Sequence, residues 1–277
     1  MEEVSIFLKD LISKTVSGSS LFRRNRLKEY LQILVLDFIY SHPKYGEMIF
    51  YGGSCLAHCH GLPRLSEDLD FVDAKGKVDI QALADDLEGH FRKETDLKLK
   101  ASTQKFRIHL KFPILRELGL AGQSESDFLF LKIEVYRNFG FCKSYKIEIV
   151  PLFKFNRSLL IRTLDLSTLM STKIRAILHR KWEKTDRKGK TLAKAKGRDY
   201  FDLMWYLGKG VKPNMNCIED VRDVAELQEK LLKIIDKVDS KSIQVDLDAL
   251  IDDENFIRNV SKDIKEILKR ELTRGMQ

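Results

Sequence analysis

The sequence has few cysteines and no long apolar run. Four cysteines in 277 residues are too few for the disulfide scaffold of a small secreted domain. No apolar stretch approaches the roughly 20 residues that a helix needs to cross a bilayer. The first residues, MEEVSIFLKD, are acidic at their start and unlike a secretory signal. We therefore expect a cytoplasmic protein in a reducing compartment, with no membrane partner.

Positive charge is in modest excess. Lysine and arginine number 49 against 41 acidic residues, a formal net charge of +8, which favours a polyanionic partner without identifying one. Residues 181–198 concentrate this excess, with 8 basic residues and 2 acidic ones. Such a segment would attract a phosphate backbone in a salt-dependent way, or it is a solvated loop. Trp182 within it would stack on a base or pack in the core.

One short run, YGGSCLAHCHGLPRLSEDLDF, carries most of the chemical information. The apolar residues just before it predict a short buried strand. Gly52 and Gly53 then allow a sharp turn and a close approach of the backbone to a ligand. Ser54 follows where a helix N-cap is expected. Because a helix start offers free N–H groups and a positive dipole end, this turn predicts a phosphate site.

Two carboxylates at alternate positions close the run. In a strand, Asp68 and Asp70 would point to the same face. Adjacent negative charges repel each other, and a bound cation offsets that repulsion. Mg²⁺ (or Mn²⁺) accepts carboxylate and phosphate oxygens, so the pair predicts a metal site beside the phosphate site. The alternative is a solvated turn, against which the flanking Leu69 and Phe71 argue.

Cysteine and histidine in the same run raise the question of zinc. Cys55 and Cys59 are four residues apart on the expected short helix and would reach one ion. No second ligand cluster accompanies them, because Cys142 and Cys217 stand alone in the sequence. We therefore expect small buried residues behind the phosphate turn.

This run resembles the nucleotidyltransferases of the polymerase-beta-like superfamily, and within them the AbiEii/AbiGii toxin-type branch. That branch shows a Gly-Gly turn and then Gly-Leu-Pro-Arg-x-Ser-x-Asp-Leu-Asp-Phe, matched here by residues 61–71. Three more motifs follow in the family's order: Lys132-Ile-Glu134-Val, Lys173-x-x-Ala-x-x-x-Arg180 and Arg198-Asp199-Tyr-Phe-Asp202-Leu. Together they cover roughly positions 48 to 207.

The resemblance implies an α/β (α+β) fold, with a polymerase-beta-like core and a mixed sheet followed by a helical C-terminal region. We expect residues 1–165 to form the nucleotidyltransferase core with N-terminal helices. Residues 166–277 would then form a helical domain that completes the nucleotide site. Periodicity predicts a helix over 79–92 and strands over 96–101, 105–112, 128–136 and 145–150.

The resemblance also assigns roles to single residues. Gly53, Ser54 and Lys173 would hold the triphosphate, with Gly52 in the turn and Arg180 beside Lys173. Asp199 would position Lys173, or it caps its helix. Arg64 and Ser66 are candidate phosphate contacts, and Arg64 is equally a candidate for a structural salt bridge.

A two-metal site needs a third carboxylate from a neighbouring strand. Glu134 and Glu148 both lie in alternating strand patterns, and the residues alone do not choose between them. The family pattern favours Glu134 as the third metal ligand.

The function implied is metal-dependent transfer of a nucleotide from an NTP. As the toxin of a bacterial toxin–antitoxin or phage-defence pair, the protein would act on RNA, such as the 3′ end of tRNA. A cognate antitoxin encoded nearby is expected. The alternatives are transfer to a protein or small-molecule hydroxyl, and an inactive fold that binds RNA or a partner.

Overall fold

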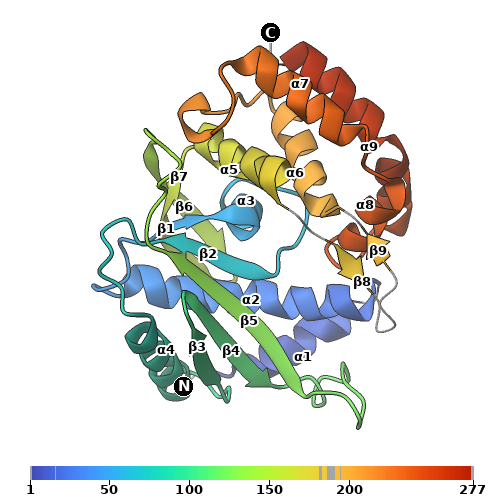
Figure 1. Cartoon of the computed structure of the whole chain (residues 1–277). Coiled ribbons are helices and arrows are strands. Elements are labelled where there is room, and N and C mark those ends of the chain that lie inside the picture. Colours follow the sequence, from blue (N-terminus) through green and yellow to red (C-terminus); the bar gives the residue numbers. More distant parts are fainter. Residues whose placement is uncertain (1, 16, 181–182, 186–190, 194, 276–277) are drawn as a thin grey trace. The chain divides into compact units, whose positions relative to one another are not determined.

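A mixed seven-stranded sheet organises the N-terminal part of the chain (Figure 1). The computed structural model describes residues 2–15, 17–180, 183–185, 191–193 and 195–275. These fall into two units, which we describe separately. The first unit contains Met1–Phe139 and Ile147–Thr163, and the second contains Gly140–Lys146 and Leu164–Gln277.

The sheet has the strand order β3-β4-β5-β2-β1-β7-β6. Parallel pairing joins β2 to β5 and β1 to β7, whereas β1–β2, β3–β4 and β4–β5 are antiparallel. The strands are β1 (Ile49–Tyr51), β2 (Asp68–Val72), β3 (Lys100–Gln104), β4 (Arg107–Pro113), β5 (Phe128–Tyr136), β6 (Ile147–Lys154) and β7 (Arg157–Leu164).

One face of this sheet is apolar and packs on helices. In β4 and β5 every second side chain is buried, as the two-residue period of a strand requires. The ring of Phe112 lies 5.5 Å from the ring of Phe91 on the packed helix α4. Figure 1 shows β5 crossing in front of α2. The helices of this unit are α1 (Val4–Lys14), α2 (Ser20–Ser41), α3 (Gly52–Cys59) and α4 (Ile80–Glu94).

The second unit is mainly helical. Its apolar helix faces pack on one another, with Leu203, Leu231 and Ile264 among the buried residues. No helix in the described parts of the chain is long and apolar enough to cross a membrane. The elements are α5 (Leu166–His179), β8 (Lys184–Thr185), β9 (Thr191–Ala193), α6 (Gly197–Gly208), a 3₁₀ turn (Met215–Cys217), α7 (Val224–Ile235), α8 (Ser240–Leu247) and α9 (Glu254–Gly275).

Most of the predicted elements are present. The strand predicted over 128–136 has those bounds in β5, and the helix predicted over 79–92 is α4, which Asp79 caps through Ala82 N–H. The strand predicted over 96–101 is wrong in position, because β3 begins only at Lys100. Strand β7 and helix α8 were not predicted. Trp182 and five of the eight basic residues of segment 181–198 lie outside the described residues.

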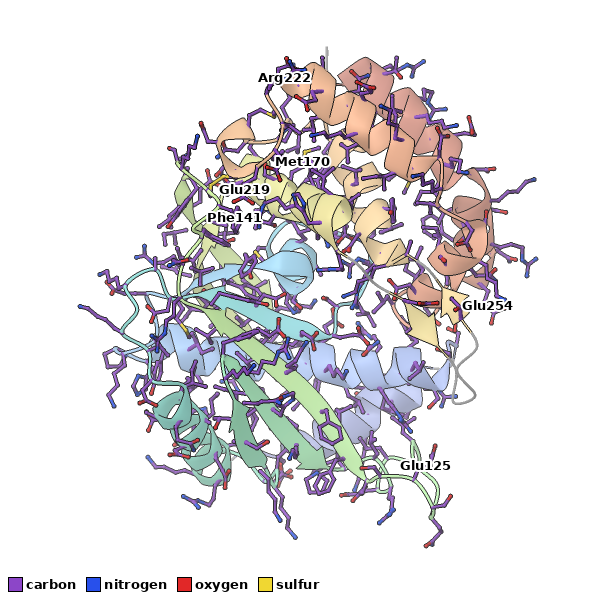
Figure 2. The ribbon with its side chains drawn as sticks, in the orientation of Figure 1. Glu125, Phe141, Met170, Glu219, Arg222 and Glu254 are labelled. Atoms are coloured by element: carbon purple, nitrogen blue, oxygen red, sulfur yellow. A yellow bond between two sulfur atoms is a disulfide. The ribbon has the colours of Figure 1, made fainter. Side chains whose placement is uncertain are left out.

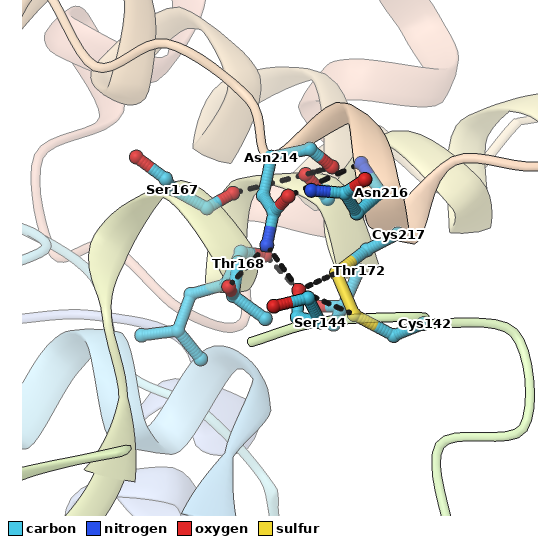
Figure 3. Close-up of a disulfide and its surroundings, with 10 residues drawn as sticks. Cys142, Ser144, Ser167, Thr168, Thr172, Asn214, Asn216 and Cys217 are labelled. Carbon is cyan, nitrogen blue, oxygen red and sulfur yellow. Dashed lines mark hydrogen bonds between the residues drawn. A yellow bond between two sulfur atoms is a disulfide. The ribbon is translucent and has the colours of Figure 1, made fainter. Parts of the chain in front are cut away.

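The segment 140–146 belongs to the second unit, although it links β5 to β6 of the first. A disulfide joins Cys142 to Cys217, and Asn214 Nδ2 donates to the Ser144 carbonyl at 2.8 Å (Figure 3). The expectation that these two cysteines stand alone is therefore wrong. They are 75 residues apart in sequence, and only the return of this segment to the second unit brings them together.

An arginine further anchors the same segment. The Arg175 guanidinium lies 3.5 Å from the centre of the Phe141 ring, and its Nη2 is 2.7 Å from Glu219 Oε2. Figure 2 labels both partners. A cation–π contact thus ties helix α5, which carries Arg175, to this segment, and the disulfide ties the segment to the 3₁₀ turn of Cys217.

Gly197 at the start of α6 provides a test of the packing in the second unit. A Cβ there would lie 2.6 Å from Ile243 Cα and 2.8 Å from the Ser242 carbonyl oxygen. Because these are backbone atoms, we expect Gly197→Ala to lower the free energy of unfolding by about 1–3 kcal/mol. Gly208→Ala, in the same helix with open space around it, should change it by less than about 1 kcal/mol. Equal urea midpoints for the two variants would contradict this packing.

Candidate active site

Parallel pairing of β2 with β5 places acidic and basic side chains on one face of the sheet. The register pairs Asp70 with Glu134, and β4 then pairs Arg107 with Glu134. Residues paired in register on neighbouring strands lie on the same face. We call Asp70, Glu134 and Arg107 the carboxylate row. The predicted strand carrying Asp68 and Asp70 is confirmed as β2.

A second row lies two residues along each strand and therefore on the same face. It consists of Asp68, Lys132 and His109, which are also paired in register. We call it the bridging row, because Lys132 Nζ lies 3.0 Å from Asp68 Oδ2 and 3.1 Å from Glu134 Oε1. One ammonium thus links the two rows.

Glu134 is held by three donors. Its Oε1 accepts from Arg107 Nε at 2.7 Å, and its Oε2 accepts from the Tyr136 hydroxyl at 2.9 Å. Lys132 is the third donor. Burial raises the pKa of the Glu134 carboxyl, but the Lys132 charge and the three hydrogen bonds outweigh it, so that the pKa lies below its usual range. Glu134 is therefore ionised at neutral pH.

The sheet separates the two candidates for a third carboxylate. Glu134 is the direct neighbour of Asp70 on the adjacent strand. Glu148 lies on β6, the opposite edge strand, from which β7 and β1 separate β2. The geometry therefore brings Glu134, and not Glu148, to the Asp68–Asp70 pair.

Helix α3 begins at the glycine pair, immediately after β1. Gly52 has a φ of 80°, in the left-handed region, and a Cβ on it would lie 2.3 Å from Asp70 Oδ2. Only glycine therefore lets the helix start this close to the carboxylate. The first-turn N–H groups of a helix have no partner within the helix and form an anion-binding end.

The prediction that Ser54 caps this helix is wrong. The helix starts two residues earlier, the N-cap is Tyr51, and Ser54 is its third residue. The Ser54 hydroxyl is fully buried and donates to the Asp68 carbonyl. The Ser54 side chain thus joins α3 to β2. The first turn of the helix is formed by the two glycines.

Arg64 and Ser66 lie against the same turn. A Cβ on Gly53 would be 2.8 Å from Arg64 Nη2 and 2.9 Å from Ser66 Oγ. Arg64 is only 6% exposed, and its Nη1 donates to the Leu65 carbonyl at 2.7 Å. The guanidinium therefore lies under the glycine pair and adds positive charge to the start of α3.

The donor set of this face suits a divalent cation in part. Asp68 and Asp70 are both half-buried, and Mg²⁺ typically takes one or two carboxylates, with the remaining positions left to water and phosphate. Among the described residues, no group of three or more His, Cys, Asp or Glu side chains is arranged to hold a metal ion. The Lys132 ammonium lies between Asp68 and Glu134.

The second unit holds its own charged cluster. Lys173 Nζ lies 2.8 Å from Asp199 Oδ1 and 2.8 Å from Asp202 Oδ2, and Arg180 Nη1 lies 2.6 Å from Asp199 Oδ2. Asp199 is 3% exposed and Asp202 fully buried. Lys173 lies on α5, Arg180 caps the end of that helix, and both aspartates lie on α6. The sequence motifs thus converge within this unit.

Lys196 belongs to the same cluster and was missed in the sequence. Burial, together with the charges of Arg198 and Arg180, lowers the pKa of its ammonium to about 8. It sits at the N-cap of α6, next to Asp199 in the fold. A lysine in a basic segment looks like a surface residue, whereas the structure places Lys196 half-buried at the start of α6.

The Asp199 carboxyl predicts an acid-dependent loss of stability. Burial raises its pKa, but Lys173 and Arg180 outweigh burial and lower the pKa from 3.8 to about 2. A carboxyl with a lowered folded-state pKa contributes stability above pH 3.8 that is lost as pH falls through 2. We expect about 2 kcal/mol from this source.

The measurement is urea unfolding between pH 5 and pH 2, followed by Trp205 fluorescence from the same helix. The difference between the wild type and Asp199→Asn should shrink as the pH falls. Asp10→Asn, which removes an exposed carboxylate paired with Lys14, should show no comparable dependence. A constant wild-type–Asp199→Asn difference over this range would contradict the ion pairs described.

Comparison with known proteins agrees with the sequence motifs. The family described as nucleotidyl transferase AbiEii toxin, type IV TA system, matches residues 37–274. MenT4, a nucleotidyltransferase toxin from Mycobacterium tuberculosis H37Rv, superposes with a TM-score of 0.58 at 11% identity, over 97% of this chain and 88% of MenT4. JHP933 from Helicobacter pylori gives 0.48 at 18% identity, over 89% and 92%. Comparison with curated proteins gives no match.

The likeness to MenT4 concerns the fold, and it confirms the predicted fold class. The family match spans the carboxylate row, the start of α3 and the charged cluster of the second unit, and it confirms the resemblance seen in the motifs. Because the matched residues 37–274 are most of the 277-residue chain, the protein belongs to the AbiEii family of nucleotidyltransferase toxins of type IV toxin–antitoxin systems.

Proposed function

We propose that this nucleotidyltransferase transfers an NMP from an NTP to an RNA acceptor such as the 3′ end of tRNA, with Mg²⁺ or Mn²⁺ as the cofactor. The observation that carries the proposal is the position of Asp68 and Asp70 on one face of β2, against the glycine start of α3. An anion-binding helix end and a pair of cation-binding carboxylates are what a metal–triphosphate needs.

The candidate site residues of the first unit have separate roles in this proposal. Asp68 and Asp70 hold the cation, with Glu134 as the third carboxylate. The N–H groups at Gly52, Gly53 and Ser54 bind the triphosphate. When bound, the metal neutralises negative charge on the attacking and leaving oxygens. Arg107 and Tyr136 fix the rotamer of Glu134, so that little reorganisation is needed.

Lys173 is proposed as a phosphate ligand in the second unit. Its two aspartate partners hold Nζ at a fixed point. Arg180 adds a guanidinium fork on the other oxygen of Asp199. Asp199 is thus a positioning residue, which acts through Lys173 and Arg180. Three cations, Lys173, Arg180 and Lys196, around two carboxylates leave this cluster positive and suited to a polyphosphate.

The acceptor is inferred from charge. A net charge of +8 and a segment with 8 basic residues favour a polyanion over a neutral small molecule. The family also implies an antitoxin, which we expect to be encoded nearby. The reaction is proposed to take place in the cytoplasm, where NTPs and tRNA are available.

The test of the function is transfer of label from each of four labelled NTPs to a tRNA pool with Mg²⁺. We expect labelled RNA, and a loss of at least about 100-fold for Asp70→Asn because metal charge stabilisation is worth several kcal/mol. Glu134→Gln should also be impaired. Glu148→Gln, which alters the carboxylate on the far edge strand, is the matched control and should retain activity.

Sequencing of the RNA 3′ ends then identifies the base and the number of nucleotides added. If protein or small molecules of a lysate are labelled and RNA is not, the proposed acceptor is wrong and the proposed nucleotidyl transfer stands. No transfer to any acceptor, together with no thermal stabilisation by NTP, would overturn the catalytic proposal.

A second prediction tests the cation site without turnover. The Lys132 ammonium competes with a divalent ion for Asp68 and Glu134, so Lys132→Met should bind Mg²⁺ more tightly. A ligand that binds only the folded state raises the free energy of unfolding by RT ln(1 + [L]/Kd). We therefore expect 10 mM Mg²⁺ to raise the free energy of unfolding of this variant more than that of the wild type.

The control is Lys75→Met, which breaks an exposed ion pair with Glu47. Its response to Mg²⁺ should match that of the wild type. The same Mg²⁺ shift in all three proteins would contradict a metal site at these carboxylates.

A further inference from the structure

The polar face of the sheet continues beyond the carboxylates into a third row. Phe130 on β5 pairs in register with Lys111 on β4, which pairs with Lys100 on β3. Phe130 is two residues from Lys132, and Lys111 is two residues from His109, so this row shares the face of the first two. We call Phe130, Lys111 and Lys100 the open row.

The side chains of the open row are available for a ligand. Phe130 is 45% exposed, Lys111 is half-buried and Lys100 is exposed. Within the described residues, neither lysine side chain has a hydrogen bond or ion pair with another residue. In the neighbouring rows, Lys132 and Arg107 are both paired with carboxylates. The cations of the open row are therefore uncompensated.

Protection of the sheet edge explains only part of this row. β3 is an edge strand, and a lysine on an edge discourages pairing with another chain. β4 and β5 are interior strands, so edge protection explains neither Lys111 nor the exposed ring of Phe130. Lys111 and Lys100 also lie directly opposite each other, an arrangement that is destabilising for like charges. A bound polyanion would offset that repulsion.

We propose that the open row binds single-stranded RNA, with a base stacked on Phe130 and phosphates on Lys111 and Lys100. An exposed aromatic ring flanked by cations is the common arrangement for single strands. The ring of Phe128, 6.2 Å from that of Phe130, extends the apolar surface. Phe130 lies four residues before Glu134 on the same strand, ~13 Å away. The inference rests on the proposed function, since it makes this RNA the acceptor strand.

The experiment measures binding of a labelled single-stranded RNA 12-mer to the full chain by fluorescence anisotropy, without NTP. Loss of one stacking contact should weaken binding by roughly 5- to 150-fold in Phe130→Ala. Lys111→Ala should reduce the slope of log K against log salt by about 0.7, the value for one phosphate contact on a single strand. Lys111→Arg should restore that slope.

Matched controls lie elsewhere in the same unit. Phe153→Ala removes a more exposed ring, 76% exposed, from β6. Lys93→Ala removes a lysine of α4, which packs on the opposite face of the sheet. Neither should change RNA affinity. Phe130→Leu, which keeps an apolar side chain at the site, should bind as weakly as Phe130→Ala while its melting temperature stays at the wild-type value.

The outcomes separate this proposal from the proposed function. If the wild type labels RNA but the open-row variants bind the 12-mer like the wild type, the open row is not the RNA-binding surface and the proposed function stands. If the variants lose RNA binding but no NTP labels any RNA, the surface stands and the function is wrong. Asp70→Asn should keep RNA binding, because it lies outside the open row. An equal loss of RNA affinity in the control variants, or a preference of the wild type for duplex RNA, would also contradict single-strand binding by the open row.

Discussion

The parallel pairing of β2 with β5 is the interaction on which the candidate site depends. It joins two segments about 60 residues apart in sequence and sets Asp70 beside Glu134 and Asp68 beside Lys132. A slip of one residue would turn the charged side chains of one strand into the apolar core. The buried Leu69, Phe71 and Ile133 therefore fix the position of the polar face as firmly as the polar residues do.

Each unit neutralises its carboxylates with a lysine. Lys132 bridges Asp68 and Glu134, and Lys173 bridges Asp199 and Asp202. Loss of one partner from the buried Lys173 cluster would leave an uncompensated charge and destabilise the fold, although desolvation of the charges offsets part of their mutual attraction. The value of these ion pairs here lies in position. A lysine held between two carboxylates presents its charge at a defined point.

The sequence motifs predicted local elements well and contacts between distant residues poorly. The strand of Asp68 and Asp70 and the bounds of β5 follow from local periodicity, whereas the convergence of Lys173 and Asp199 follows from the family resemblance. The start of α3 was wrong because the φ of Gly52 lets the helix begin two residues before Ser54. Contacts between residues that are distant in the sequence were also missed. The Cys142–Cys217 disulfide and the burial of Lys196 depend on how distant segments pack, which no local pattern records.

The fold and the acceptor are constrained by different residues. MenT4 shares the fold at only 11% identity, so the fold places few demands on side chains outside the core and motifs. In the function proposed, the carboxylate row would serve any acceptor hydroxyl, since its task would be to organise charge at the reacting phosphate. Discrimination among acceptors must then come from side chains that touch the acceptor away from the reacting end. On the same face as the carboxylates, the open row offers one exposed aromatic side chain and two lysines that are not occupied by ion pairs among the described residues.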